Sequence, residues 1–294
     1  MVPITFVHGW GELSERDRLI AMGEFAANGA RHLVLGDAMM KLMDGDYFLP
    51  RTILKQAEAA GVDFVGAHVP FKEFGDLYAP EERERQQMVA RHKLHLLLVD
   101  EFGVDNCTFH IGSKYRPEYS VEAHREALFR SLDELLPLAE KLHITICLEN
   151  LRGPLNTTDD LIFCMEKYRS PYLGVCFDSG HANMKEQGEA YPDSAVRPIW
   201  ESANLEIRWE KDIVERLKPY MVTCHIHDNS GIRDDHDLPG TGTVNWKRIV
   251  DALATAPRLK CIQSEVQTWR YGIPIRTLTE NIFCLFGVRP ELQN

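Results

Sequence analysis

The chain has 294 residues, of which 44% are hydrophobic and 26% are charged, and it carries a formal net charge of −11. This length fits one large domain, because an eightfold α/β barrel needs about 250 residues. The negative charge opposes the phosphate backbone of nucleic acids, and the sequence has no cluster of five or more Lys and Arg residues. Nucleic acid is therefore a disfavoured partner.

The sequence has no run of 18 apolar residues, and its first residues, MVPITFVHGWGE, lack a basic stretch followed by an apolar one. We therefore expect a cytoplasmic protein with no membrane span and no leader. No C-x-x-C pair occurs among the seven cysteines. Five of them lie within apolar, strand-like runs, namely Cys107, Cys147, Cys176, Cys224 and Cys261. This pattern indicates buried, reduced thiols and no disulfide framework.

Short β-rich segments alternate with amphipathic helical segments along the whole chain. We predict strands at 3–8, 32–36, 63–68, 106–111, 144–149, 172–178, 221–227 and 261–266. The clearest predicted helices are 81–102, 118–142, 157–168, 244–256 and 276–287. Strands that alternate with helices pair in parallel, so eight such units predict an α/β fold, a single (β/α)8 TIM barrel that covers residues 1–294.

The interval between the sixth and seventh predicted strands is longer than a (β/α)8 barrel requires. About forty residues separate Asp178 from the seventh strand, where one helix and two short loops would suffice. The segment 183–208 holds the excess. We expect it to form an extra loop or helix between strands six and seven, over the mouth of the barrel.

Seven of the eight predicted strands end on an ionisable or imidazole side chain. In chain order these are His8, His68, His110, Glu149, Asp178, His227 and Glu265. Strand alternation places Glu149, Asp178 and Glu265, together with His225 and His227, on the polar side that faces the barrel interior. Taken singly, each residue has an ordinary explanation, such as a hydrogen-bonded core histidine or an Asx turn at Asp178. Together they predict a divalent metal ion, because several carboxylates in one mouth are costly to bury without a cation.

Several motifs carry a resemblance to a known superfamily. They are ICLEN (146–150), CFDSGHAN (176–183), CHIHDN (224–229), DDHDLPGTGTVNW (234–246) and SEV (264–266), with weaker matches at GAHVPF (66–71) and TFHIG (108–112). The chain resembles the xylose isomerase-like barrels. That superfamily includes sugar-phosphate isomerases and epimerases, the D-tagatose 3-epimerase group, inosose dehydratase and endonuclease IV.

The resemblance implies that Glu149, Asp178 and Glu265 bind one divalent ion, which would be Mn²⁺, Mg²⁺, Co²⁺ or Zn²⁺. The fourth ligand would be a histidine of strand seven. The H-x-x-[D/E] spacing selects His225, which stands three residues before Asp228, and His227 is the rival.

Further residues are implied to contact the substrate or additional ions. The substrate-binding candidates are His68, His110, His181, His227 and Arg233. Asp234 and His236 match positions at which members with several metal ions bind the extra ones, as do His68 and His110, so a second or third ion stays open. The alternative is that Asp234 and His236 anchor the loop before Pro239. Trp10, Phe71 and Trp269 are candidates for an apolar wall of the site.

The resemblance favours a sugar isomerase or epimerase that acts on a small sugar or polyol. Such an enzyme removes a proton next to a carbonyl through a metal-stabilised enediolate, with Glu149 and Glu265 as the acid/base pair. One alternative is an endonuclease IV-like phosphodiesterase with three zinc ions, and another is a lyase similar to inosose dehydratase. A barrel that has lost its chemistry is opposed by the intact set of four metal-ligand candidates. The resemblance names neither the sugar nor the oligomeric state, although relatives often form homo-oligomers.

Overall fold

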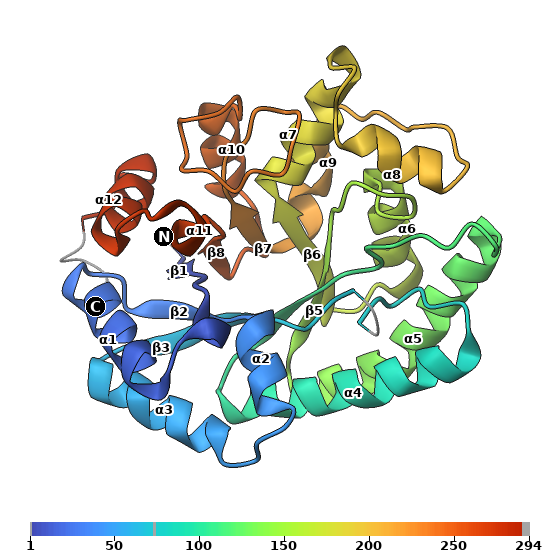
Figure 1. The fold of residues 1–294 in the computed structure, drawn as a ribbon. Coiled ribbons are helices and arrows are strands. Elements are labelled where there is room, and N and C mark those ends of the chain that lie inside the picture. Colours follow the sequence, from blue (N-terminus) through green and yellow to red (C-terminus); the bar gives the residue numbers. More distant parts are fainter. Residues whose placement is uncertain (1, 73–74, 290–294) are drawn as a thin grey trace.

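The computed structural model describes residues 2–72 and 75–289, and its eight strands form one closed barrel (Figure 1). The strands are β1 (Ile4–Phe6), β2 (His32–Leu35), β3 (Asp63–His68), β4 (Asn106–Phe109), β5 (Thr145–Glu149), β6 (Leu173–Asp178), β7 (Met221–Ile226) and β8 (Cys261–Ser264). Every neighbouring pair is parallel, including the pair β1 and β8 that closes the barrel. Each strand lies within one predicted segment, and the predicted (β/α)8 fold is confirmed.

Helices surround the barrel (Figure 1). They are α1 (Glu15–Ala27), α2 (Asp37–Met43), α3 (Leu49–Ala60), α4 (Glu82–Glu101), α5 (Val121–Lys141), α6 (Thr158–Tyr168), α7 (Ser179–Gln187), α8 (Val196–Ser202), α9 (Ile213–Leu217), α10 (Trp246–Leu253), α11 (Thr268–Tyr271) and α12 (Ile275–Leu285). Short 3-10 turns lie at Trp10–Glu12, Gly188–Ala190 and Lys218–Tyr220. The five clearest predicted helices correspond to α4, α5, α6, α10 and α12.

Local sequence explains where several helices begin. The Ser120 hydroxyl accepts the backbone N–H of Ala123 at 3.1 Å and so caps α5. Thr157 and Asp160 form a reciprocal capping box at the start of α6. Asp178 caps α7, because one of its carboxylate oxygens accepts the N–H of His181 at 2.6 Å. This cap places His181 one turn beyond Asp178, beside the carboxyl ends of the strands.

The inside of the barrel is partly polar beneath the strand ends. Gln263 donates to the Thr223 hydroxyl at 2.8 Å, and the Cys261 thiol lies 3.6 Å from the Asn106 amide oxygen. Gly66 has a φ of +83°, and a Cβ at this position would lie 2.6 Å from the Gln263 amide nitrogen. These buried side chains form a filled floor under the strand ends.

The predicted extra segment between strands six and seven is confirmed. After α7 the chain forms a 3-10 turn and then α8, which packs through Val196 and Trp200 against Met184. The Trp200 indole N–H donates to the Arg152 carbonyl at 2.8 Å, and Ile199 lines the cavity at the mouth of the barrel. The segment therefore forms part of the wall of that mouth.

Two smaller expectations concern membranes and thiols. Within residues 2–72 and 75–289, no helix has both the length and the apolar character that crossing a bilayer requires. The seven cysteines are free thiols, and the five predicted to be buried are buried. Cys284 is the exposed one.

Candidate metal centre

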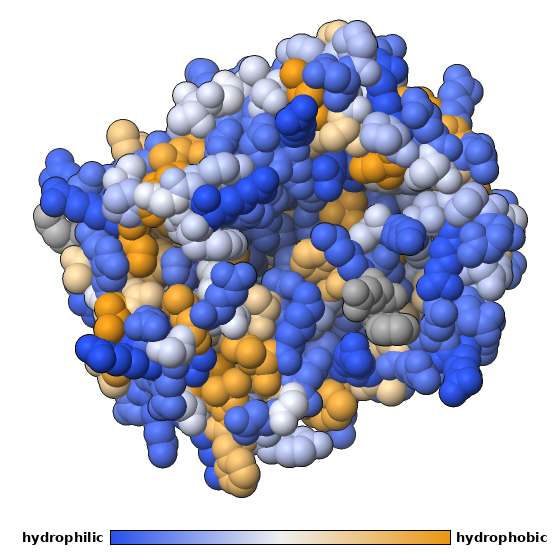
Figure 2. Space-filling model, in the orientation of Figure 1, coloured by the Kyte–Doolittle hydropathy of each residue, from blue (hydrophilic) through white to orange (hydrophobic). Residues whose placement is uncertain are grey.

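A cavity of about 340 Å³ opens at the carboxyl ends of the strands. In the same orientation as Figure 1, Figure 2 shows a central hollow bordered mostly by hydrophilic residues. Seven of the predicted site residues line the cavity, namely His68, His110, Glu149, His181, Asp234, His236 and Glu265. Asp178, His225 and His227 are fully buried and contact several of these side chains. The structure therefore brings these predicted residues together at the carboxyl ends of the strands, and their roles stay predictions.

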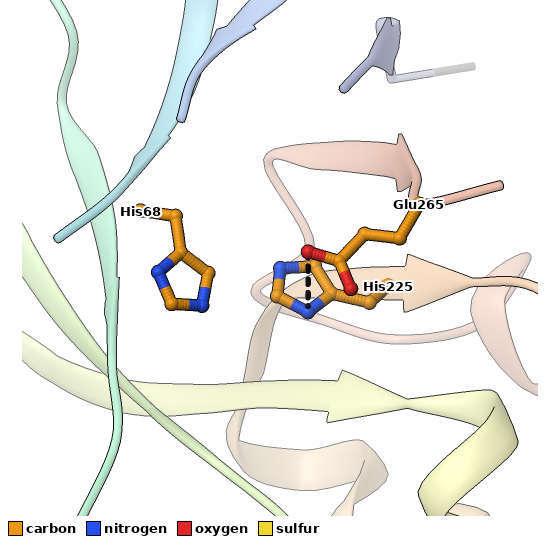
Figure 3. Close-up of side chains that lie close together, drawn as sticks. All are labelled: His68, His225 and Glu265. Atoms are coloured by element: carbon orange, nitrogen blue, oxygen red, sulfur yellow. Dashed lines mark ion pairs between the residues drawn. The ribbon is translucent and has the colours of Figure 1, made fainter. Parts of the chain in front are cut away.

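Three carboxylates surround one ring nitrogen of His225. Its Nδ1 lies 3.4 Å from Glu265 Oε1, 3.6 Å from Glu149 Oε1 and 3.8 Å from Asp178 Oδ2. Figure 3 shows the Glu265 carboxylate beside this ring, with His68 facing them from β3. Neither ring nitrogen of His225 has a hydrogen-bond partner within the described chain, although the side chain is fully buried. Donors around one tetrahedral ion at ~2.0–2.2 Å lie roughly 3.3–3.6 Å apart, close to the distances of Glu265 and Glu149 from His225 Nδ1. Glu149, Asp178 and His225 together have metal-ligand spacing.

Glu149 is shared between two groups of histidines. Its Oε2 lies 2.9 Å from His110 Nε2 and 3.4 Å from His68 Nε2. Its other oxygen, Oε1, lies 3.2 Å from His181 Nδ1 and 3.6 Å from His225 Nδ1. The side chain is only 2% exposed. A carboxylate in this position can bridge two cations.

Hydrogen bonds fix which nitrogen of His68 and His110 carries the proton. His68 Nδ1 donates to the Val69 carbonyl at 2.8 Å. The Ser113 hydroxyl donates to Asp76 at 3.1 Å, so it accepts from His110 Nδ1 at 3.0 Å. Both neutral rings then present an Nε2 lone pair to Glu149 Oε2. Two acceptors that face each other require a cation or a proton between them, and this tautomer is the one that metal-binding histidines adopt.

A third donor set has the same arrangement around Asp234. His181 Nδ1 donates to the Asn150 carbonyl at 3.1 Å, while its Nε2 lies 3.3 Å from Asp234 Oδ2. His236 Nδ1 donates to the Glu265 carbonyl at 3.0 Å, and its Nε2 lies 3.6 Å from the same Asp234 oxygen. The other oxygen of Asp234 has no partner among the described residues. We refer to the groups around His225, around Glu149 Oε2 and around Asp234 as the donor sets. Four overlapping triplets of the described residues have donor atoms that all lie within 4.8 Å of one another, namely Glu149, Asp178 and His225; His68, His110 and Glu149; His68, His225 and Glu265; and His227, His236 and Glu265.

The electrostatics of the site favour positive charge beside the carboxylates. Burial opposes the charged form of His225, but Glu265 and Glu149 outweigh it and raise the pKa to about 9. Burial likewise opposes the charged form of His236, but Asp234 outweighs it and raises the pKa to about 9. Burial alone would raise the pKa of Asp178, but His181 and His227 lower it to about 2. The neighbouring imidazoles therefore hold Asp178 ionised, and its negative charge attracts cations.

His227 has a different environment from His225. Its Nε2 lies 3.1 Å from Asp178 Oδ2, and its ring stacks on His236 with a centroid separation of 3.9 Å. A Cβ on Gly180 would lie 2.0 Å from the His227 ring, so only glycine leaves room for it. This geometry suits a residue that orients Asp178, although His227 also has metal-ligand spacing to His236 and Glu265. The choice of His225 over His227 as the metal ligand stays a prediction.

Some predicted contacts lie elsewhere. Trp10 is fully buried and packs on Phe25 with a centroid separation of 6.0 Å, so its assignment to the cavity wall is wrong because it belongs to the core. His8 packs against Trp10 and Trp269, outside the donor sets. Trp269 is 42% exposed, and Phe71 does line the cavity.

The structure also corrects the choice of arginine. Arg233 is exposed and is not among the residues that line the cavity, so the structure does not bring it to the predicted substrate position. Arg152 lines the wall instead, and its guanidinium lies 3.2 Å from Asp234. Sequence reasoning missed Arg152, although it stands only two residues after the ICLEN motif.

The model of one protein family, described as the xylose isomerase-like TIM barrel, matches residues 26–272. The chain belongs to this family.

Two curated relatives are also similar. Uncharacterized protein y4fM of Sinorhizobium fredii is 28% identical over 193 residues, which cover 64% of this chain and 55% of y4fM. Uncharacterized protein MJ1311 of Methanocaldococcus jannaschii is 27% identical over 231 residues, 74% of this chain and 70% of MJ1311. The chain thus spans little more than half the length of y4fM.

Several solved structures share the fold. A D-tagatose 3-epimerase-like protein superposes with a TM-score of 0.73 at 20% identity, covering 97% of both chains. The 3-keto-D-glucoside 4-epimerase YcjR from E. coli gives 0.72 at 15% identity, covering 97% of this chain and 99% of YcjR. The IOLI protein, described with a bound zinc atom, gives 0.70 at 14% identity and covers 98% of both chains. Sugar epimerases are thus among the proteins with this barrel.

Proposed function

We propose that the chain is a divalent-metal-dependent isomerase or epimerase of a sugar or sugar derivative. The observation that carries this proposal is the set of three carboxylates around His225 Nδ1, at 3.4 to 3.8 Å. The cavity above it, about 340 Å³, lies in the range of small-molecule sites. The sugar epimerases that share the fold give further support.

The residues that would hold the ion are Glu149, Asp178, His225 and Glu265. A bound divalent ion would supply positive charge next to the substrate oxygen that becomes negative when a neighbouring carbon loses its proton. Glu265, with a side chain 17% exposed, reaches the cavity from β8, and Glu149 reaches it from β5. One carboxylate would take the proton from carbon, and the other would return a proton on the opposite face. His181 lines the cavity and would bind a substrate hydroxyl.

The test is a screen of ketoses and inositols for incorporation of solvent deuterium with Mn²⁺ present. Glu149→Gln and Glu265→Gln should each slow the exchange by about 10²-fold or more, because a positioned acid or base contributes that much. Glu126→Gln, on an exposed residue of α5, is the matched control and should exchange like the parent. If neither Glu149→Gln nor Glu265→Gln changes the rate of deuterium exchange, the two-carboxylate mechanism is ruled out. Loss of water from an inositol would instead identify a lyase.

Hydrolysis of a phosphoester is a second candidate, and one observation favours it. His68, His110, His181 and His236 each present Nε2 to a carboxylate, so the nine donor residues can surround three ions (distances above). Clustered metal ions stabilise the oxygens that enter and leave in phosphoryl displacement. The net charge of −11 opposes a DNA substrate. Elemental analysis separates the two candidates, since about one ion per chain supports the isomerase and three zinc ions support the hydrolase. Efficient incision of an abasic duplex would decide for the nuclease.

A further inference from the structure

The acidic side chains that line the cavity belong to the donor sets, and the basic ones lie outside them. Every carboxylate on the described part of its wall belongs to a donor set, namely Glu149, Asp234 and Glu265. Besides histidines, the other ionisable side chains there are those of Lys72, Arg152 and Arg270, all basic. The wall thus carries as many acidic as basic side chains, and the basic ones are those that lie outside the donor sets.

These three side chains come from three different loops. Lys72 follows β3, Arg152 follows β5, and Arg270 lies in α11, which follows β8. Since the carboxyl ends of all eight strands meet at one opening, residues far apart in the sequence border the same space. We refer to Lys72, Arg152 and Arg270 as the basic rim.

Lys72 and Arg270 are exposed, and each contacts residues of its own loop. The backbone N–H of Lys72 donates to Asp76 at 3.3 Å, and its ammonium lies 5.3 Å from the centroid of the Phe71 ring. The guanidinium of Arg270 lies 5.3 Å from the Tyr271 ring and contacts the Gln267 amide oxygen at 3.4 Å.

Arg152 belongs to the basic rim and also contacts a residue of the donor sets. Its guanidinium lies 3.2 Å from Asp234, and its side chain is 27% exposed. Its backbone carbonyl is fixed by the Trp200 indole at 2.8 Å. Guanidinium groups bind phosphate and carboxylate through paired N–H donors, whereas a neutral sugar requires no positive charge for its binding.

We propose that the substrate carries an anionic group, a phosphate or a carboxylate, which the basic rim binds while the rest of the molecule lies over the donor sets. This inference rests on the proposed function, which supplies the sugar part of the substrate. It distinguishes this chain from epimerases that act on neutral sugars. A rim of this charge also raises the local concentration of an anionic substrate, and added salt weakens the effect.

The test compares charged and neutral ligands, using the whole chain loaded with Mn²⁺. Isothermal titration with ribulose 5-phosphate, ribulose and inorganic phosphate measures affinity, and ribonate supplies the carboxylate arm. Arg270→Gln and Lys72→Gln should each weaken binding of ribulose 5-phosphate or inorganic phosphate by roughly 3- to 10-fold, as expected for one charged contact near solvent. Binding of ribulose should change less than 2-fold. Arg233→Gln is the matched control, because Arg233 is exposed and does not line the cavity.

The outcomes distinguish this inference from the proposed function. Tighter binding of ribulose 5-phosphate than of ribonate identifies a phosphate, and the reverse identifies a carboxylate. The basic rim is not an anion site if the charged and neutral ligands bind with equal affinity. The same conclusion follows if the rim variants and Arg233→Gln lose equal amounts of affinity for ribulose 5-phosphate. Deuterium exchange in a neutral ketose would leave the isomerase proposal intact in that case. Anion binding that depends on Arg270 and Lys72, without exchange in any ligand, would support the rim and overturn the isomerase.

Discussion

The imidazole of His110 presents an acceptor to Glu149, with Nε2 only 2.9 Å from Oε2. The reason lies on the other side of the ring, where Ser113 accepts from Nδ1 and donates to Asp76. Asp76 is itself fixed, because it also accepts the backbone N–H of Ser113 at 2.7 Å. This chain from Asp76 through Ser113 keeps His110 in the form that binds a cation.

Ser113→Ala should therefore weaken metal binding without unfolding the barrel. Removing a residue that orients a metal-binding histidine typically costs 10- to 100-fold in metal affinity. Competition with a chelator gives the dissociation constant, and elemental analysis after dialysis gives the number of ions per chain. Ser202→Ala is the control, because that hydroxyl contacts only the Ile199 carbonyl within α8. Equal affinities in the two variants would contradict the role of Ser113.

Divalent metal should stabilise the folded chain. An ion that binds the native state alone adds about 2.7 kcal/mol to the free energy of unfolding when its free concentration is 100 times the dissociation constant. Urea unfolding with Mn²⁺ or Zn²⁺, and again after addition of EDTA, measures the difference. His225→Ala should remove most of it, because His225 lies at the centre of one donor set. A free energy of unfolding that is insensitive to both metal and EDTA would argue against the metal centre.

The pKa values of His225 and His236 predict opposite pH dependence with and without metal. Both pKa values are raised from 6.5 to about 9 by neighbouring carboxylates that outweigh burial. Their protonated forms thus contribute stability that is fully present below pH 6.5 and is lost as the pH rises through about 9. Metal-free protein should lose stability over this window. Metal affinity should rise over the same window, because the ion competes with fewer protons. Unfolding curves at pH 6.5, 7.5 and 9 test both trends, and a flat metal-free profile would contradict them.

Gly180→Ala should destabilise the site. The new Cβ would lie 2.0 Å from the His227 ring and 2.8 Å from the Asn229 amide nitrogen, so buried side chains must move. Overpacking of this kind typically costs about 1–3 kcal/mol. Gly23→Ala in α1 is the matched control, since nothing lies within 4 Å of that position, and it should stabilise by about 0.5–1 kcal/mol. Urea unfolding of both variants compares them, and equal stabilities would mean that the space beside His227 is not needed.

Most of the fold could be predicted from sequence, because barrel strands are short apolar runs separated by helices. The helix α7 was not among the clear predictions, and its burial explains why. Residues 179–185 are all buried, so the helix shows no alternation of polar and apolar faces. Its first residue follows directly on Asp178, which is both the last residue of β6 and the helix cap. A single motif therefore contains a strand end, a cap and a metal-ligand candidate.

Glu149, Asp178, His225 and Glu265 could be predicted from the sequence because they stand at or next to strand ends, where parity fixes their direction. His181, Asp234 and His236 lie beyond the strand ends and were predicted from the family resemblance alone. Ser113, Asp76 and Arg152 could not be predicted in the same way. Their contacts join one loop to another, as when Asp76 binds Ser113 across 37 positions of sequence. The choice between Arg233 and Arg152 likewise depends on loop conformation, for which strand periodicity gives no rule.

The hydrogen bond between Trp200 and the Arg152 carbonyl has a consequence for how specificity diverges in this family. The inserted segment supplies Ile199 to the wall and also holds the backbone of Arg152. An exchange of this segment between relatives would change the shape of the pocket and the position of a charged group in a single event. New substrate preferences can thus arise by replacement of one surface insertion, while the barrel and its donor residues stay unchanged.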